Sequence, residues 1–138
     1  MTEKVTQVKL SYGRCAVSPK FFEDFYDDFM DSSPLIRARF ENTDMEAQRA
    51  LLRHGLSHLI MYAAGSHAAG MKVDRLADSH AKGKLDIQPW MYRHWIDSLL
   101  RTVQNHDRKA DDLLLLVWKE TVQHGVDKMV AGHGGGRI

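Results

Sequence analysis

The sequence predicts an all-α protein. Apolar residues recur at three- to four-residue spacing along most of the chain, no segment alternates apolar and polar residues between hairpin turns, and each proline stands where a helix would begin. The 138 residues suit one domain that can bury a core without disulfides. We expect about seven helices in a domain over residues 1–131, followed by a disordered glycine-rich tail at 132–138.

The first half of the chain has three helix starts. Ser18-Pro19 is expected to open a helix that runs to about Met30. The aromatic residues at helical spacing on one face of this helix are Phe22, Phe25, Tyr26 and Phe29. Ser33-Pro34 opens a short helix to Phe40, and Asp44 caps a long helix over 45–64 that Gly65 ends.

The second half predicts three more helices. A short one begins at Val73 and reaches about Ala81, and Pro89 starts another that runs to about Gln104. The last helix spans 111–130. Its apolar face is expected to contain Leu113, Leu114, Leu116, Val117 and Val126.

Composition excludes several classes of function. A formal net charge of +1 leaves no basic stripe for phosphates, so we expect no nucleic-acid partner. No apolar run resembles a signal peptide or spans a bilayer, and the single cysteine, Cys15, forms no intrachain bridge. We therefore expect a cytoplasmic protein without a membrane partner. Glycine-rich phosphate loops and paired-carboxylate motifs are absent from the sequence.

Several short motifs occur in an order typical of one family. Phe40 follows Pro34 by six residues and Tyr26 by fourteen. The segment 76–82, Leu-Ala-Asp-Ser-His-Ala-Lys, precedes 87–92, Ile-Gln-Pro-Trp-Met-Tyr, and Asp-Met-Glu-Ala-Gln at 44–48 opens the long helix. Together these motifs resemble the globin superfamily over about residues 6–130, above all bacterial single-domain haemoglobins, flavohaemoglobin haem domains and sensor globins. The resemblance implies a three-over-three helical sandwich with a short or absent D helix.

The resemblance also implies a haem b cofactor (iron protoporphyrin IX) bound through His80. A neutral imidazole near the end of a short helix can be aimed at iron, and the carbonyls of Leu76 or Ala77 would hold its other ring nitrogen. Phe40 would stack on the porphyrin. The other side chains implied in the haem pocket are Leu52, Leu85, Tyr92 and Trp95.

On the opposite side of the haem, the resemblance assigns Tyr26 and Gln48 to the ligand. A phenol and an amide are both hydrogen-bond donors, and bound dioxygen carries partial negative charge. Arg49 would replace Gln48 if the helix were rotated by one residue. The alternative is that Tyr26 is a core residue bonded to a backbone carbonyl and that Gln48 faces solvent.

Two other features have weaker interpretations. His54 and His58 have the i, i+4 spacing of a zinc pair, but the usual glutamate and a cysteine cluster are missing, so an outward-facing or inter-helical position is favoured. Cys15 has no base beside it in the sequence, so a packed or surface thiol is expected.

The predicted function is reversible binding of dioxygen, nitric oxide or carbon monoxide by a monomer or homodimer. Nitric oxide dioxygenation is the enzymatic version, and because the chain is too short to hold a reductase it would require a separate one. The alternatives are a gas sensor acting through a partner or dimer interface, and a haem-free helical interaction domain.

Overall fold

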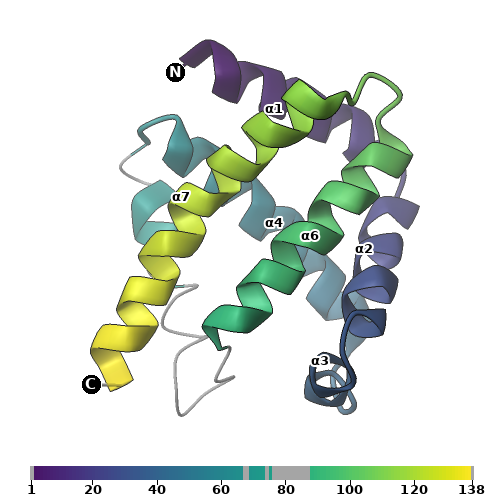
Figure 1. Cartoon of the computed structure of the whole chain (residues 1–138), viewed down its shortest axis with the longest axis vertical. Helices are drawn as coiled ribbons and strands as arrows, with labels where there is room; N and C mark the ends of the chain where they lie inside the picture. The colour runs from purple at the N-terminus through teal and green to yellow at the C-terminus, as the bar shows by residue number, and fades with distance from the viewer. Residues whose placement is uncertain (1, 67–68, 74, 76–87, 138) are drawn as a thin grey trace.

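The computed structural model describes residues 2–66, 69–73, 75 and 88–137, and they form a set of packed α-helices (Figure 1). The helices are α1 (Thr2–Ala16), α2 (Lys20–Asp31), α3 (Pro34–Arg39), α4 (Met45–Ala63), α6 (Pro89–His106) and α7 (Asp112–Arg137). Residues 69–73 are also helical. These ranges contain no strand, so the all-α prediction is confirmed.

The helices pack in crossed pairs that join the two halves of the chain. In Figure 1, α6 and α7 run beside each other and α4 crosses behind them. α2 packs on α6, α4 packs on α7, and α1 lies across the beginning of α7. The core therefore forms between segments that are far apart in sequence.

Local sequence signals set the helix ends. Ser33 Oγ accepts a hydrogen bond from the Leu35 amide, and Asp44 Oδ1 accepts from the amides of Glu46 and Ala47. The predicted caps at Ser33 and Asp44 are thus confirmed. Gly65, with φ of 94°, closes α4 in a left-handed turn in which Ser66 N donates to Met61 O.

The aromatic face of α2 forms one side of the core. Its buried residues are Phe21, Phe22, Phe25, Tyr26 and Phe29. Burying each phenylalanine side chain contributes about 1.5 to 3 kcal/mol to stability. The predicted face is confirmed, and this rigid aromatic layer positions the side chains that reach α3 and the start of α4.

A close approach between α4 and α7 depends on Gly125. A Cβ atom placed at this position would lie 2.3 Å from Leu59 Cδ2 on α4. Glycine is a poor helix former, but here the missing side chain lets the two helices touch. The second half of α4 is thereby packed tightly against α7.

No helix was assigned to the N-terminal segment from the sequence, and the structure shows α1 there. Its buried positions include Val5, Val8 and Cys15. Ser11 Oγ donates to Asp107 Oδ2 at 2.6 Å and accepts from Trp118 Nε1 at 2.9 Å. The spacing of the buried residues is helical, but polar residues surround them, which hides the pattern.

The side chains that anchor α1 include an ion pair. The Arg14 guanidinium donates to both carboxylate oxygens of Asp107, at 2.7 and 2.9 Å. Burial works to raise the pKa of Asp107, but the hydrogen bonds from Arg14, Ser11 and the Lys109 amide outweigh it and hold the pKa at about 2. Asp107 therefore stays ionised at neutral pH and fixes α1 to the connection between α6 and α7.

The last helix differs from the prediction in two respects. Leu113 and Leu116 are 69% and 52% exposed, because the face of α7 that packs is the one containing Val117, Trp118 and Val122. The helical backbone also continues to Arg137, past the predicted end at Val130 and into the stretch 132–138 expected to be disordered. Glycine lowers helix propensity by about 1 kcal/mol per residue without forbidding the helix.

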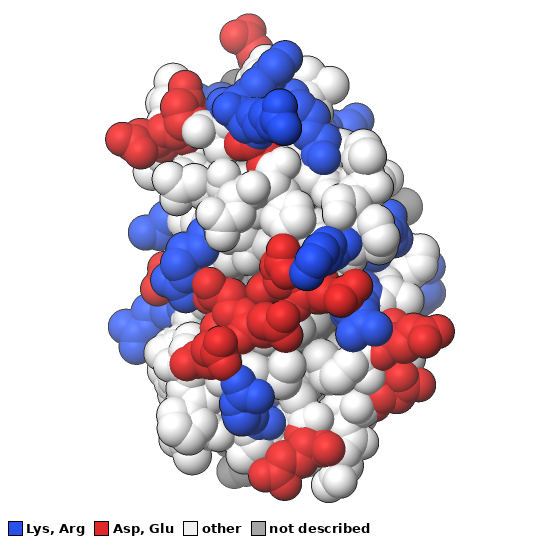
Figure 2. Space-filling model, turned by 90° about the vertical axis from the view of Figure 1, so that its right-hand side faces the viewer, with Lys and Arg blue, Asp and Glu red and all other residues white. Residues whose placement is uncertain are grey.

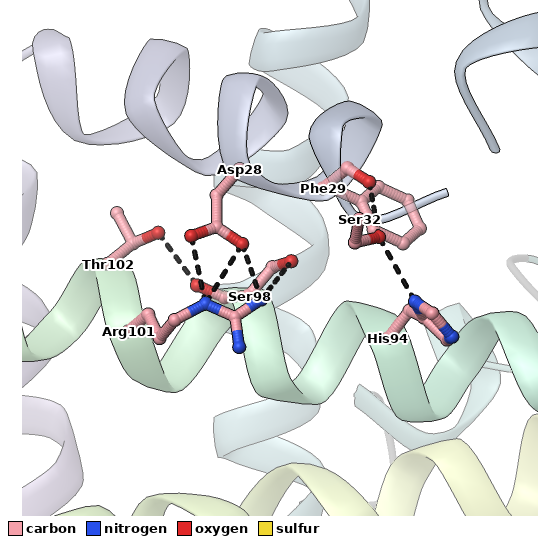
Figure 3. A network of polar contacts seen from close by, with 7 residues as sticks. All are labelled: Asp28, Phe29, Ser32, His94, Ser98, Arg101 and Thr102. Atoms are coloured by element: carbon pink, nitrogen blue, oxygen red, sulfur yellow. Dashed lines mark hydrogen bonds and ion pairs between the residues drawn. The ribbon is translucent and has the colours of Figure 1, made fainter. Parts of the chain in front are cut away.

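Polar side chains join α2 to α6 along their shared edge (Figure 3). Arg101 Nη2 donates to Asp28 Oδ1 at 2.7 Å. Closer to the start of α6, His94 Nδ1 lies 3.1 Å from Ser32 Oγ. The Ser32 hydroxyl donates to Phe29 O at 2.6 Å. Because that proton is used, the Ser32 oxygen is the acceptor, and His94 has its proton on Nδ1.

Acidic side chains gather on the face that Figure 2 shows, with basic side chains around them. Several acids of α2 have cationic partners: Asp24 pairs with Lys20, Asp28 with Arg101 and Asp31 with Arg37. These pairs keep the local excess of negative charge small.

Among the described residues, no helix is long and apolar enough to cross a membrane.

Candidate ligand pocket at Tyr26 and Gln48

Tyr26 lies in an aromatic cluster contributed by α2 and the end of α3. It is 4% exposed, and its ring centroid lies 5.0 Å from that of Phe25 and 5.6 Å from that of Phe40. Phe40 also meets Phe29 edge to face at 6.0 Å. These edge-to-face contacts fix the direction of the Tyr26 ring. The phenol oxygen is consequently held beside the first turn of α4.

Gln48 meets that phenol oxygen. Its Nε2 donates to Tyr26 Oη at 3.2 Å, and the side chain is half-buried. The structure thus brings together the two residues that the resemblance pairs. Gln48 makes this contact with Tyr26, and the choice between Gln48 and Arg49 as the side chain that faces a bound ligand stays a prediction.

The hydroxyl proton of Tyr26 has no strong acceptor in the part of the chain that the structure describes. Its contact there is the backbone carbonyl of Gln48 at 3.5 Å. That distance is the outer limit for a hydrogen bond, since O–H···O bonds are typically about 2.5 to 3.0 Å long. The hydroxyl can therefore turn to a better acceptor at little cost.

Tyr26 remains a proton donor at physiological pH. Burial raises the pKa of its hydroxyl to about 12, against the opposing effects of the Gln48 hydrogen bond and the Arg49 charge. A neutral phenol and a neutral amide then stand together among apolar side chains. This arrangement can donate hydrogen bonds to a small polar molecule, and it offers no ionised group for acid or base catalysis.

Three further predicted pocket residues are described. Leu52, one turn after Gln48 on α4, is buried, and so is Tyr92 on α6. Trp95 is half-buried, with its ring edge to face against Phe25 at 5.8 Å. Burial raises the pKa of Tyr92 to about 12. Side chains of α2, α4 and α6 thus contribute to one apolar region.

The predicted iron ligand cannot be compared with the structure. His80 lies outside the described residues, as do Leu85 and the carbonyls of Leu76 and Ala77. Their roles stay predictions from the resemblance.

The histidine pair of α4 has no third ligand among the residues that are described, because no group of three metal-binding side chains occurs there. Burial lowers the pKa of His58, and the charges of Lys72 and His54 lower it further. A neutral, half-buried His58 beside an exposed His54 fits the outward position that was expected. Cys15 is buried, and burial raises its pKa to about 12, so it is a packed thiol as expected.

Other histidines have partners that the sequence did not indicate. His106 Nε2 lies 2.7 Å from Asp24 Oδ2, and the ring of His124 stacks on Tyr62 at 4.8 Å. Each contact joins residues more than sixty positions apart, so no local spacing could have revealed it.

Comparisons with known proteins give a strong similarity to a solved structure. No protein-family model matches the chain, and no curated protein matches it. A crystal structure of a Pseudomonas aeruginosa PAO1 protein, described as structurally highly homologous to a human haemoglobin, is similar with 42% identity and a TM-score of 0.89. The match covers 94% of this chain and 98% of that one.

Proposed function

The chain belongs to the globin family, and from this premise we propose that it binds haem b beside Tyr26 and Gln48 and holds dioxygen there reversibly. The globin fold expected from the sequence is confirmed. The binding of haem and of dioxygen is what we propose beyond the fold. The observation that supports this proposal is the hydrogen bond from Gln48 to the Tyr26 phenol.

The described side chains fit a porphyrin with a polar ligand on one side. Phe40 and Leu52 supply apolar surface beside the donor pair, and Trp95 and Tyr92 approach from α6. Within the described residues, the acceptor of the Tyr26 hydroxyl proton is a carbonyl at 3.5 Å, which leaves the proton available to a ligand. His80 and Leu85 complete the set that would hold the group.

Haem, when bound, supplies a ferrous iron that takes diatomic molecules as ligands. Tyr26 and Gln48 would stabilise the more polar of these molecules. By donating to the phenol oxygen, Gln48 polarises the Tyr26 O–H bond and makes it a stronger donor. The Tyr26 hydrogen bond would contribute about 1 to 3 kcal/mol in a site shielded from water. That corresponds to release slowed by roughly tenfold to a hundredfold.

Nitric oxide and carbon monoxide are further ligands of the same site in this proposal. When bound, carbon monoxide would carry the least negative charge of the three, so it would gain least from the two donors. Turnover of nitric oxide with a separate reductase and gas sensing through a partner stay predictions, because no contact among the described residues favours either.

Absorption spectra test the proposal. The purified protein supplied with haemin should show a Soret band, and its pyridine haemochrome should be that of haem b. His80→Ala should remove the histidine-ligated spectrum, whereas His54→Ala, an exposed position on α4, should leave it unchanged. The proposal is wrong if no Soret band forms, and the assignment of His80 is wrong if its variant keeps the wild-type spectrum.

A further inference from the structure

The first turns of α7 expose a face that combines apolar and charged side chains. Asp112, Leu116 and Lys119 follow one another at spacings of four and three residues, so they lie on one side of the helix. Leu113 borders this line three residues before Leu116. All four side chains are exposed, Leu113 by 69% and Leu116 by 52%, whereas Val117 packs on the other side. We call these four residues the α7 leucine face.

The two exposed leucines continue an apolar surface that begins in the core. Leu114 and Leu115, which stand between them in the sequence, are half-buried and pack against the core. Apolar side chains therefore fill positions 113–116, and the outward ones gain free energy when another surface covers them. Leucines on adjoining turns of one helix form a ridge that suits packing against a second helix.

The charges of the α7 leucine face have no partner within the described part of the chain. Asp112 and Lys119 form no ion pair there, whereas Glu120 on the same helix lies 3.9 Å from Lys4 of α1. Asp112 and Lys119 are seven residues apart, roughly 10 Å along the helix axis, which is too far for them to pair with each other. The face therefore has a negative charge at one end, a positive charge at the other and leucine between them.

We propose that the α7 leucine face binds the same face of a second copy of the chain, with the two helices antiparallel about a two-fold axis beside Leu116. A two-fold axis makes each contact occur twice. Asp112 of one copy then lies opposite Lys119 of the other at both ends, and the leucines meet in the middle. A parallel pair would instead place like charges together, so the order of the charges selects the antiparallel direction. The proposal does not depend on haem, since none of these residues belongs to the proposed haem pocket.

The size of the contact sets its strength. Two single helices cover less surface than the about 1,200 to 2,000 Å² of a stable interface, so the dimer should be weak and reversible, with a Kd between roughly 10 µM and 1 mM. Sedimentation equilibrium of the purified full chain over this range of concentration measures it. The expected result is a monomer–dimer equilibrium.

Reversal of each charge tests the pairing. Asp112→Lys places two lysines opposite each other at both ends of the pair, and Lys119→Asp does the same with two aspartates, so each should weaken the dimer by about tenfold or more. The matched control is Asp27→Lys, at an exposed position on α2, which makes the same change in net charge and should leave the Kd as it is. Circular dichroism checks that every variant is folded.

Mixing the two reversed variants gives the decisive measurement. One copy of Asp112→Lys and one copy of Lys119→Asp again have opposite charges at both ends, so the mixture should dimerise about as well as the wild type. Leu116→Glu should abolish the dimer. A wild type that stays monomeric over the whole range, or a mixture that associates no better than its separate components, would overturn the proposal. So would a dimer that Leu116→Glu and both charge reversals leave intact.

Discussion

The two ends of α4 present opposite chemistry on one continuous helix. At the first turn, Gln48 faces a buried phenol among phenylalanine rings, and the polar groups there are neutral donors. At the last turn, Tyr62 lies beside an open pocket with a lysine and an exposed histidine. A tyrosine ring lies at each end, Tyr26 from α2 and Tyr62 from α4 itself, so the residue type does not set the role of the ring. The neighbours contributed by other helices decide whether the ring is packed in the core or borders a cavity.

The largest expected effect is on the free energy of unfolding, which should respond very differently to substitutions at the two ends of α4. Phe25→Ala removes a fully buried ring that contacts Tyr26, Phe29 and Trp95, and we expect a loss of about 3 to 5 kcal/mol in the free energy of unfolding. Met71→Ala, at the exposed rim of the other end, should change it by less than about 0.5 kcal/mol. Urea denaturation followed by circular dichroism measures both. Similar losses would mean that the ends do not differ in packing.

A smaller effect concerns the attachment of the second half of α4. Gly125→Ala places a methyl group 2.3 Å from Leu59 Cδ2, and we expect about 1 to 3 kcal/mol of destabilisation from overpacking. Gly13→Ala in α1, where an added Cβ meets nothing within 4 Å, is the matched control and should be neutral or stabilising. If both variants melt at the same temperature, the close approach of α4 and α7 is not a constraint.

The next prediction concerns the rate of dioxygen release at the end of α4 where Gln48 contacts Tyr26. Tyr26→Phe keeps the ring and removes its hydroxyl, so dioxygen release from the haem-loaded protein should become roughly tenfold to a hundredfold faster. Gln48→Leu should give a smaller increase of the same sign, because Tyr26 can still donate. Stopped-flow measurement of release gives the rates, and Tyr62→Phe at the other end should match the wild type. An unchanged rate in Tyr26→Phe would refute the distal role.

The last prediction is a pH dependence of stability that concerns Asp107 and neither end of α4. Asp107 has a pKa of about 2 in place of 3.8, so it contributes stability above pH 4 that is lost as the pH falls through about 2. The contribution is about 2 kcal/mol. Asp107→Asn should be less stable at pH 7, and the difference from the wild type should shrink between pH 4 and pH 2. If the difference in stability between the wild type and Asp107→Asn stays constant with pH, the charge of Asp107 does not contribute to stability.

Local rules predicted much of the fold. Caps such as Ser33 and Asp44 satisfy amides within two or three residues, so their effect is contained in the sequence nearby. The aromatic face of α2 was equally clear because four of its rings share helical spacing. In α7, a run of four leucines fits several helical faces, and packing against α1, α4 and α6 selects the one that is buried.

The candidate site at Tyr26 and Gln48 was predictable only through family resemblance. Tyr26 and Gln48 are 22 residues apart, and no spacing rule joins them. Their hydrogen bond depends on the packing of α2 against α4, which the sequence does not specify locally. The pocket beside Tyr62 had no sequence signal, since Tyr62 and His124 are 62 positions apart and meet only because α4 crosses α7.

The attachment of α1 has a consequence for how the chain acquires its structure. Ser11 bonds to Asp107 and Trp118, across separations of 96 and 107 residues. During synthesis these contacts of the first helix must therefore wait until α6 and the start of α7 have left the ribosome. Contacts between residues so far apart in sequence slow folding. A chain truncated before Trp118 should therefore depend on chaperones.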